Sequence, residues 1–355
     1  MDLFKKFETE ERIFRDERLL MPDYIPDELP HREREIDEIA YSLKPILNDS
    51  KPENIVIIGQ SGTGKTTTVK YVANELESHT KKALIIYINC WEFPTRHGIL
   101  TKMISSFGDF VPRRGIATDE LLEKLSSIAK GEKKTPVVIL DEVDRLEKES
   151  KEENVLYDLA RSKEVLGLDI AVIAITNDEN FSSRLDSRIR VSLLQKQLHF
   201  KPYTPNQLRD ILKERAKKAL RAATYDDDVI GLCVAYGVKA GGDARTAISS
   251  LWRAGRNAER EDRGKILPED VKRAYGEASD AKKEEQAETL NEKEKRILEL
   301  LEEREWTSGE LGDALQMEER LLRNYIANLE KLGFIEVEKT RIGQGWSRKI
   351  RKKSH

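Results

Sequence analysis

The chain has 355 residues, of which 38% are hydrophobic and 36% are charged, and its formal net charge is −3. Its two cysteines and five histidines are scattered along the sequence, so we expect neither a disulfide framework nor a zinc site. No apolar stretch approaches the ~18–20 residues that a membrane span requires, and the N-terminus is charged, so we expect no span and no signal peptide. The length suggests about two or three domains, and the cytoplasm is the expected location.

Three kinds of pattern follow one another along the chain. Residues 1–50 form a polar lead-in that we expect to be largely helical. From about 51 to 200, apolar strands alternate with amphipathic helices, which predicts an α/β domain with a parallel sheet covered on both faces. Helices without strands follow over 205–276, with prolines at two expected helix starts. The charged stretch Ala278–Glu288 reads as a solvated helix or a linker.

A glycine-rich loop follows the first apolar strand. Residues 59–66 read Gly-Gln-Ser-Gly-Thr-Gly-Lys-Thr and come after the apolar run 54–58. The glycines let successive N–H groups point at a phosphate, and the helix that begins near Lys65 adds its positive end. Lys65 is expected to reach the β- and γ-phosphates, and the Thr66 hydroxyl to ligate Mg²⁺. The nucleotide-binding residues predicted in this loop are Gly59, Gly62, Thr63, Gly64, Lys65, Thr66 and Thr67.

Two carboxylates end another buried strand, at residues 136–142. Asp141 is suited to hold Mg²⁺, usually through water, and Glu142 is suited to orient or deprotonate an attacking water. A further strand at 170–175 is followed by Thr-Asn, which would place Asn177 beside Asp141 at the carboxyl edge of the sheet. An amide there suits the positioning of the water. The combination predicts an ATPase that uses ATP and Mg²⁺.

Residues 285–355 carry a separate pattern. Helical stretches over 292–303, 308–315 and 318–332 precede a hairpin whose tip falls at 341–345. This order is typical of a winged helix, in which the second helix of a helix-turn-helix enters the major groove of DNA. Residues 331–355 contain eight Lys and Arg against two Glu, and the basic tail at 348–353 favours DNA as the ligand. A winged helix that contacts proteins is the alternative.

The winged-helix pattern also predicts individual DNA contacts. Arg320, Arg323 and Asn324 fall on the exposed side of the second helix, where base edges would be read. Arg341 and Arg348 fall in or beside the hairpin, where they suit contact with a minor groove or with phosphates.

Further motifs carry a family resemblance over almost the whole chain. They are Tyr24-Ile25-Pro26, His31-Arg32-Glu33-Arg34-Glu35, Phe200-Lys201-Pro202-Tyr203, Arg215 and Gly242-Asp243-Ala244-Arg245. With the two nucleotide motifs, they resemble the archaeal replication initiators related to the origin recognition complex and cell division control proteins. The resemblance implies a P-loop AAA+ domain at 1–204, a helical lid at 205–284 and a winged helix at 285–355.

The resemblance also implies roles in nucleotide binding for residues outside the phosphate loop. Ile25 and Pro26 would line the adenine pocket. Tyr203 and Arg215 would contact the nucleotide as well, and Arg245 would be the lid arginine that faces the γ-phosphate.

Two further roles concern neighbouring molecules. Arg188 resembles the arginine that AAA+ proteins insert into a neighbour's site, although Arg184 and Arg190 lie close by. An insertion at 94–130 is similar to insertions that touch duplex DNA in this family, which makes Arg113 and Arg114 candidates for DNA contact.

The resemblance implies an ATP-dependent replication initiator with slow hydrolysis. It would bind double-stranded origin DNA and help to recruit or load the replicative MCM helicase, with other initiator paralogues as further candidate partners. One alternative is a branch-migration motor like RuvB, whose acidic and lid motifs read differently and which lacks a matching lead-in. The other is a nucleotide-gated DNA-binding regulator that changes conformation with little turnover.

Overall fold

The computed structural model describes residues 13–111, 116–132, 134–148, 154–342 and 345–353. The chain divides into two compact units, Met1–Val271 and Lys272–His355. Their boundary falls inside one helix, α13 (Pro268–Thr289). The three domains with boundaries at 204 and 284 stay a prediction. Within the described ranges, no helix is both long enough and apolar enough to cross a membrane.

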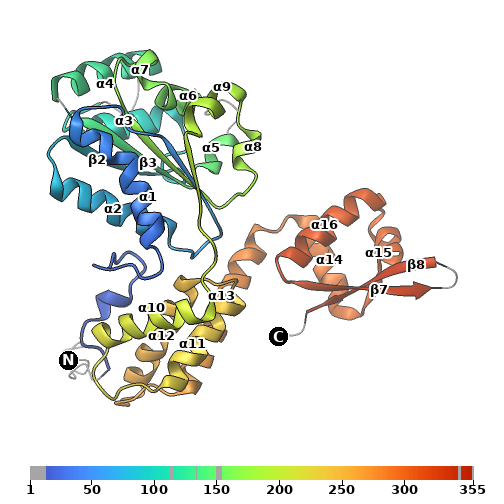
Figure 1. Cartoon of the computed structure of the whole chain (residues 1–355). Coiled ribbons are helices and arrows are strands. Elements are labelled where there is room, and N and C mark those ends of the chain that lie inside the picture. The colour runs from blue at the N-terminus through green and yellow to red at the C-terminus, as the bar shows by residue number, and fades with distance from the viewer. Residues whose placement is uncertain (1–12, 112–115, 133, 149–153, 343–344, 354–355) are drawn as a thin grey trace, which may run out of the picture. The chain divides into compact units, whose positions relative to one another are not determined.

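The first unit contains a five-stranded parallel sheet with the order β2-β3-β4-β1-β5, which Figure 1 shows surrounded by helices. The strands are β1 (Ile55–Ile58), β2 (Ala83–Asn89), β3 (Thr135–Asp141), β4 (Ala171–Thr176) and β5 (Lys196–His199). The α/β prediction is confirmed. Strand β5 is not identified in the sequence analysis, because this short edge strand has no fully buried position and its sequence is largely polar.

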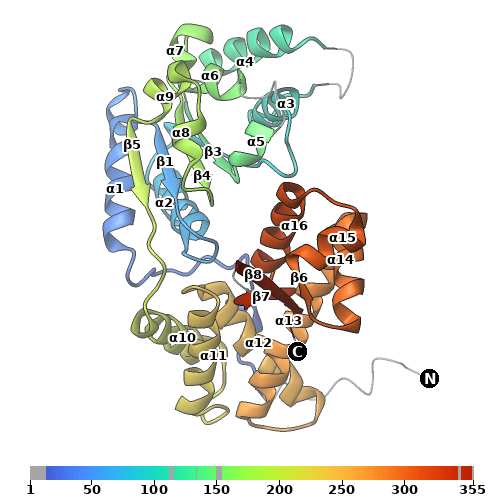
Figure 2. The ribbon, with the colours of Figure 1, turned by 90° about the vertical axis from the view of Figure 1, so that its right-hand side faces the viewer.

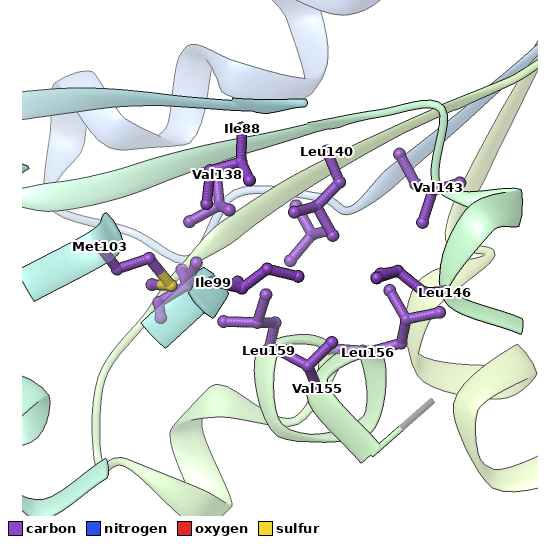
Figure 3. Packing of buried hydrophobic residues seen from close by; sticks show 14 of the residues in the cluster. Ile88, Ile99, Met103, Val138, Leu140, Val143, Leu146, Val155, Leu156 and Leu159 are labelled. Atoms are coloured by element: carbon purple, nitrogen blue, oxygen red, sulfur yellow. The ribbon is translucent and has the colours of Figure 1, made fainter. Parts of the chain in front are cut away.

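Helices cover both faces of this sheet, with α1 on one side and α3 and α5 on the other (Figure 2). Ile57, Ile139 and Ile173 pack with α1 and α2 on one face. Val138 and Leu140 point to the other face, where they pack with α3, α5 and α6 (Figure 3). The helices are α1 (Glu33–Leu43), α2 (Lys65–His79), α3 (Arg96–Ser106), α4 (Thr118–Glu132), α5 (Asp144–Lys148), α6 (Asn154–Ala160), α7 (Ser162–Val165), α8 (Phe181–Arg184) and α9 (Ser187–Leu193).

The lead-in is less helical than the sequence suggests. Beside α1 it contains the short 3-10 helices η2 (Glu17–Leu20) and η3 (Lys44–Asn48). Residues 21–32 form no helix. Prolines at 22, 26 and 30 explain this, because each lacks an N–H donor and disfavours a helical conformation of the residue before it.

The lid consists of α10 (Pro205–Ala219), α11 (Asp227–Lys239), α12 (Ala244–Arg260) and the beginning of α13. Helix α10 starts at a proline, as predicted, and Thr204 and Gln207 close a capping box before it. The four helices enclose their own apolar core, which includes Leu208, Leu251 and Val271.

The first described residues of the lead-in are bound to this lid. The N–H groups of Arg15 and Asp16 both donate to the carbonyl of Ala219. The ring of Phe14 packs so closely on Gly255 that a Cβ atom there would lie 2.5 Å from it. The lid therefore anchors the segment that leads to Tyr24 and Pro26.

The second unit has the order of elements that the winged-helix prediction requires. Its elements are α14 (Glu292–Glu303), β6 (Trp306–Thr307), α15 (Ser308–Leu315), α16 (Glu319–Lys331), β7 (Ile335–Ile342) and β8 (Gly345–Lys352). The strands form an antiparallel sheet with the order β6-β8-β7. Thr307 and Glu310 close a capping box on α15, and Gly333, with φ +79°, follows the end of α16.

Candidate nucleotide-binding site

The glycine-rich loop joins the end of β1 to the start of α2. Gly64 is the N-cap of α2 with φ +86°, and a Cβ atom there would lie 2.6 Å from the Tyr203 hydroxyl. Gly62 has φ +73°, and the Asp243 carboxylate occupies the space that a Cβ atom would need. Glycine is therefore required at both positions. Each has a positive φ, and each is closely approached, Gly64 by Tyr203 and Gly62 by Asp243.

Lys65 lies buried at the first turn of α2. Its Nζ donates to the carbonyls of Gly59 and Gln60 at 2.7 and 2.8 Å and to Oδ1 of Asn177 at 2.8 Å. Burial lowers the pKa of Lys65 to about 8, although the nearby Asp141 opposes the shift. Asp141 and Asn177, predicted to lie beside each other, both border the cavity that Lys65 lines.

Asp141 ends β3 on the same face of the sheet as α2. Its Oδ2 accepts hydrogen bonds from the hydroxyls of Thr66 and Tyr87, both at 2.8 Å. Its Oδ1 accepts the backbone N–H of Glu142 at 3.0 Å. The carboxylate and the Thr66 hydroxyl are hard oxygen ligands that border one cavity, so the donor set fits Mg²⁺.

Glu142 follows Asp141 with the left-handed backbone angle φ +57°. A non-glycine residue in this region is strained, and such strain is found at functional sites. Burial raises the pKa of Glu142, and the charges of Asp141 and Asp144 raise it further. The side chain borders the cavity, where a carboxylate of raised pKa suits a general base.

A cavity of about 380 Å³ brings these residues together with the lid and the lead-in, a volume in the range of small-molecule sites. Its lining includes Gly62, Thr63, Gly64, Lys65, Thr66, Thr67, Asp141, Glu142, Asn177, Tyr203, Arg215 and Arg245. Gly59 is not among the lining residues. It begins the loop, and a Cβ atom there would lie 2.5 Å from the carbonyl oxygen of Phe200.

The cavity also has less polar lining residues, which suit a base. Tyr24 and Pro26 line it, together with Ile211 and Ile248 of the lid. Ile25 is half-buried and is not among the lining residues, and its role at the adenine stays a prediction.

Arg215 lies between the lead-in and this part of the cavity. Its guanidinium donates to the carbonyl of Leu19 at 2.6 Å and lies 4.6 Å from the ring centre of Tyr24. Arg215 also lines the cavity, and its contact with the nucleotide stays a prediction.

The two arginines with predicted catalytic roles are in different surroundings. Arg245, at the start of α12, is exposed at the cavity, and its charge acts on both Lys65 and Glu142. Arg188 lies outside the cavity lining, 74% of its side chain is exposed, and it pairs with Asp186 at 3.1 Å. Such an exposed position is one that a second molecule can reach, and the role of Arg188 stays a prediction.

Arg32 has a structural role that its sequence context does not predict. It is only 4% exposed, and its guanidinium donates to the carbonyls of Thr63 and Lys201 and to the Tyr203 hydroxyl at 2.7–3.1 Å. It also lies 4.0 Å from the ring centre of Tyr203. One buried cation thus holds the phosphate loop against residues 201–203, which lead to the lid. The only sequence signal is its place in the lead-in motif.

The predicted DNA contacts are only partly described by the structure. Arg320, Arg323 and Asn324 are exposed on α16, as predicted, and Arg323 pairs with Glu319. Arg341 lies in β7, and Arg348 is exposed on β8. Arg113 and Arg114 lie outside the described residues.

The basic stretch at the end of the chain is not a tail. Residues 348–352 belong to β8, the central strand of the small sheet. Arg351 pairs with Glu336 at 2.7 Å and with Glu338 at 3.2 Å, and Lys349 pairs with Glu305. The excess of positive charge in this segment is therefore reduced by carboxylates that are close only after folding.

Comparison with known proteins gives the family. Residues 48–174 match AAA domains, and residues 209–276 match the Cdc6 AAA+ ATPase-type lid domain. The ORC1-type DNA replication protein of Thermococcus kodakarensis is 37% identical over 297 residues, which make up 81% of this chain and 71% of that protein. The structure of the Aeropyrum pernix ORC1 protein in complex with DNA is 31% identical, with a TM-score of 0.81 over 97% of this chain and 94% of that one.

The branch-migration motor RuvB shares only the fold. The Thermotoga maritima protein is 18% identical, with a TM-score of 0.51 over 92% of this chain and 95% of that one. The chain belongs to the family of ORC1-type DNA replication proteins, with an AAA domain and a lid of the AAA+ ATPase type.

Proposed function

We propose that this protein is an ATP-dependent replication initiator that binds double-stranded origin DNA and helps to load the replicative helicase. The observation that carries the proposal is the joining of four elements around one cavity. The phosphate loop, the Asp141-Glu142 pair, Asn177 and Arg245 all border it, in a chain of ORC1-type sequence. Relatives with that name are DNA replication proteins, and the Aeropyrum pernix ORC1 protein binds DNA.

The chemistry at this cavity is ATP hydrolysis. The loop N–H groups and Lys65 would bind the phosphates, because the ammonium lies at the start of α2 beside two backbone carbonyls that a phosphate oxygen can replace. Glu142 would take the proton of the attacking water, and Asn177 would orient that water. Thr66 and Asp141 would hold Mg²⁺, which supplies positive charge that offsets the charge of the phosphates.

The hydrolysis is proposed to be slow because the groups that it needs come from different parts of the first unit and from a second molecule. Glu142 follows β3, whereas Arg245 begins a lid helix. Arg188 would come from a second copy of the chain, since it is exposed and outside the cavity of its own chain. Turnover would then be limited by the conformational change that brings the lid and the neighbouring molecule into position around the same nucleotide.

The DNA would be held at two places. Helix α16 of the second unit exposes Arg320, Arg323 and Asn324, which is the set that a major-groove reader needs. The insertion that contains Arg113 and Arg114 would form a second contact with the duplex. Other initiator paralogues are proposed as partners on the same DNA. The cytoplasmic location stays a prediction.

Helicase retention on DNA tests the proposal. An immobilised duplex that carries the origin is incubated with purified MCM helicase, ATP and this protein. The helicase should be retained only with the protein, and Lys65→Ala should abolish the retention. Retention that does not depend on the protein contradicts the loading role. Hexamers with DNA-stimulated turnover would favour the branch-migration motor, and binding to promoters without helicase retention would favour the regulator.

A further inference from the structure

Tyr87 is a residue of the nucleotide cavity to which no role has yet been given. It is half-buried near the end of β2, and its ring packs against the core between the sheet and α2. Its hydroxyl reaches the edge of the sheet, borders the cavity and donates to Oδ2 of Asp141 at 2.8 Å. A carboxylate oxygen only accepts, so the Tyr87 hydroxyl is the donor in this contact.

The register of the sheet explains how this contact arises. Tyr87 pairs with Ile139 and Asn89 with Asp141, so Ile139 and Asp141 point to the same face of β3 as Tyr87 does on β2. Helix α2 covers this face. Lys70 of that helix lies with its ammonium 4.0 Å from the ring centre of Tyr87, which restrains the ring from above.

Asp141 Oδ2 has two donors, and they differ in one respect. Thr66 is itself a predicted ligand of Mg²⁺. When its hydroxyl coordinates a cation, it no longer fixes the orientation of Asp141 by the hydrogen bond seen here. Tyr87 donates from the neighbouring strand and has no such second role. The N–H of Glu142 restrains only the other oxygen, Oδ1.

We propose that Tyr87 is a positioning residue for the magnesium site, whose hydroxyl fixes the Asp141 carboxylate in the orientation that a cation needs. This inference rests on the proposed nucleotide site but goes beyond its predicted ligands. Outer hydrogen bonds of this kind tune the affinity of metal sites through the ligand that they orient. Tyr87 then matters for the metal and hardly for the nucleotide alone.

The change Tyr87→Phe tests this, because it removes only the hydroxyl. Nucleotide affinity is measured by calorimetry with excess EDTA, and the half-saturating Mg²⁺ concentration by titration of the ADP complex. The metal-free affinity should stay within about twofold of the wild-type value, while the half-saturating Mg²⁺ concentration should rise roughly three- to tenfold, the range expected for one hydrogen bond. Tyr71→Phe is the matched control, since Tyr71 packs against the same core, and it should change neither value.

The other outcomes are equally decisive. An unchanged Mg²⁺ requirement in Tyr87→Phe overturns the proposal, and so does a loss of metal-free nucleotide binding, which would show that the hydroxyl merely maintains the fold. The assay contains no DNA and no helicase, so it is independent of the replicative role. If the wild-type protein itself bound no nucleotide, the proposed function would fail rather than the assignment of Tyr87.

Discussion

Lys65 donates a hydrogen bond to Asn177 at 2.8 Å, which joins the first turn of α2 to the residue that follows β4. The same ammonium contacts two carbonyls of the phosphate loop. A bound phosphate would compete for this ammonium, so Asn177 lies where it can respond to the engagement of Lys65. Asn177 and Glu142 border the same cavity, which connects binding with hydrolysis.

Lys65 and Glu142 should separate binding from chemistry. Glu142→Gln keeps the size of the side chain but removes the base, so hydrolysis should fall by at least about 10²-fold while ATP binding remains. Lys65→Ala removes the charged donor, so binding itself should fall by roughly 10- to 100-fold. Phosphate release and equilibrium binding of ATP measure the two effects. Wild-type turnover in Glu142→Gln would contradict the assigned base.

Nucleotide affinity should depend on alkaline pH through Lys65. Its pKa of about 8 in the free protein means that the ammonium is fully present below this pH and is lost as pH rises through it. Bound phosphate favours the charged form and raises that pKa, so the complex holds more protons than the free protein in this range.

The ADP dissociation constant should therefore rise between about pH 7 and about pH 9.5, by up to roughly tenfold per unit above the free pKa. Calorimetry in buffers of different ionisation heat should show proton uptake on binding at alkaline pH. A constant affinity without proton uptake would show that Lys65 stays charged throughout this range.

Arg32 should stabilise the phosphate loop through its fork of donors. Arg32→Lys keeps the charge but cannot donate to Thr63, Lys201 and Tyr203 together. Leaving buried acceptors unpaired should lower the free energy of unfolding by about 1–3 kcal/mol and weaken nucleotide binding. Chemical denaturation and ADP titration measure both. Arg34→Lys, at an exposed position, is the control. Equal changes of stability and ADP affinity in the two variants would show that Arg32 does not hold the phosphate loop.

The second unit should distinguish base contacts from backbone contacts. Arg323→Ala or Asn324→Ala should cost roughly 1–3 kcal/mol on specific sites only. Arg348→Ala should weaken binding to most sequences and flatten the salt dependence. Arg351→Ala is the matched control on the same strand, because its two carboxylate partners already engage it and its loss should matter less. Uniform losses for Arg323 would argue against base reading.

The insertion arginines should act independently of the second unit. Deletion of 285–355 should weaken origin binding greatly but leave a contact that alters the footprint. That contact should disappear with the double change of Arg113 and Arg114 to alanine. Footprinting of the wild-type protein, the truncated protein, the double variant and the truncated double variant checks this. Intact binding after truncation would make the second unit a protein-docking module, and a silent double change would remove the insertion from the interface.

The motifs of the phosphate site could be predicted because each is local in sequence and follows a strand. The expected closeness of Asp141 and Asn177 rests on the same rule, and the two strands that precede them along the chain are adjacent in the sheet. Arg32 could not be found in this way, because its partners Thr63 and Lys201 become neighbours only in the folded chain. The same holds for the hydroxyl of Tyr87, whose sequence context is that of any apolar strand.

The basic end of the chain shows the opposite error. Its charge count predicts a basic tail at 348–353, but residues 345–352 form β8, and folding places Glu305 and Glu336 beside this strand. Composition gives the net charge of a segment and not its partners. The irregular lead-in could have been predicted from the sequence, because the prolines at 22, 26 and 30 interrupt any helix there.

The most direct test of the initiator role is genome-wide mapping of the sites that this protein occupies in growing cells, together with the positions at which DNA synthesis starts. Occupied sites should coincide with replication starts, and this coincidence should be lost in Lys65→Ala. Occupied sites that lie at promoters, away from every replication start, would contradict the initiator role.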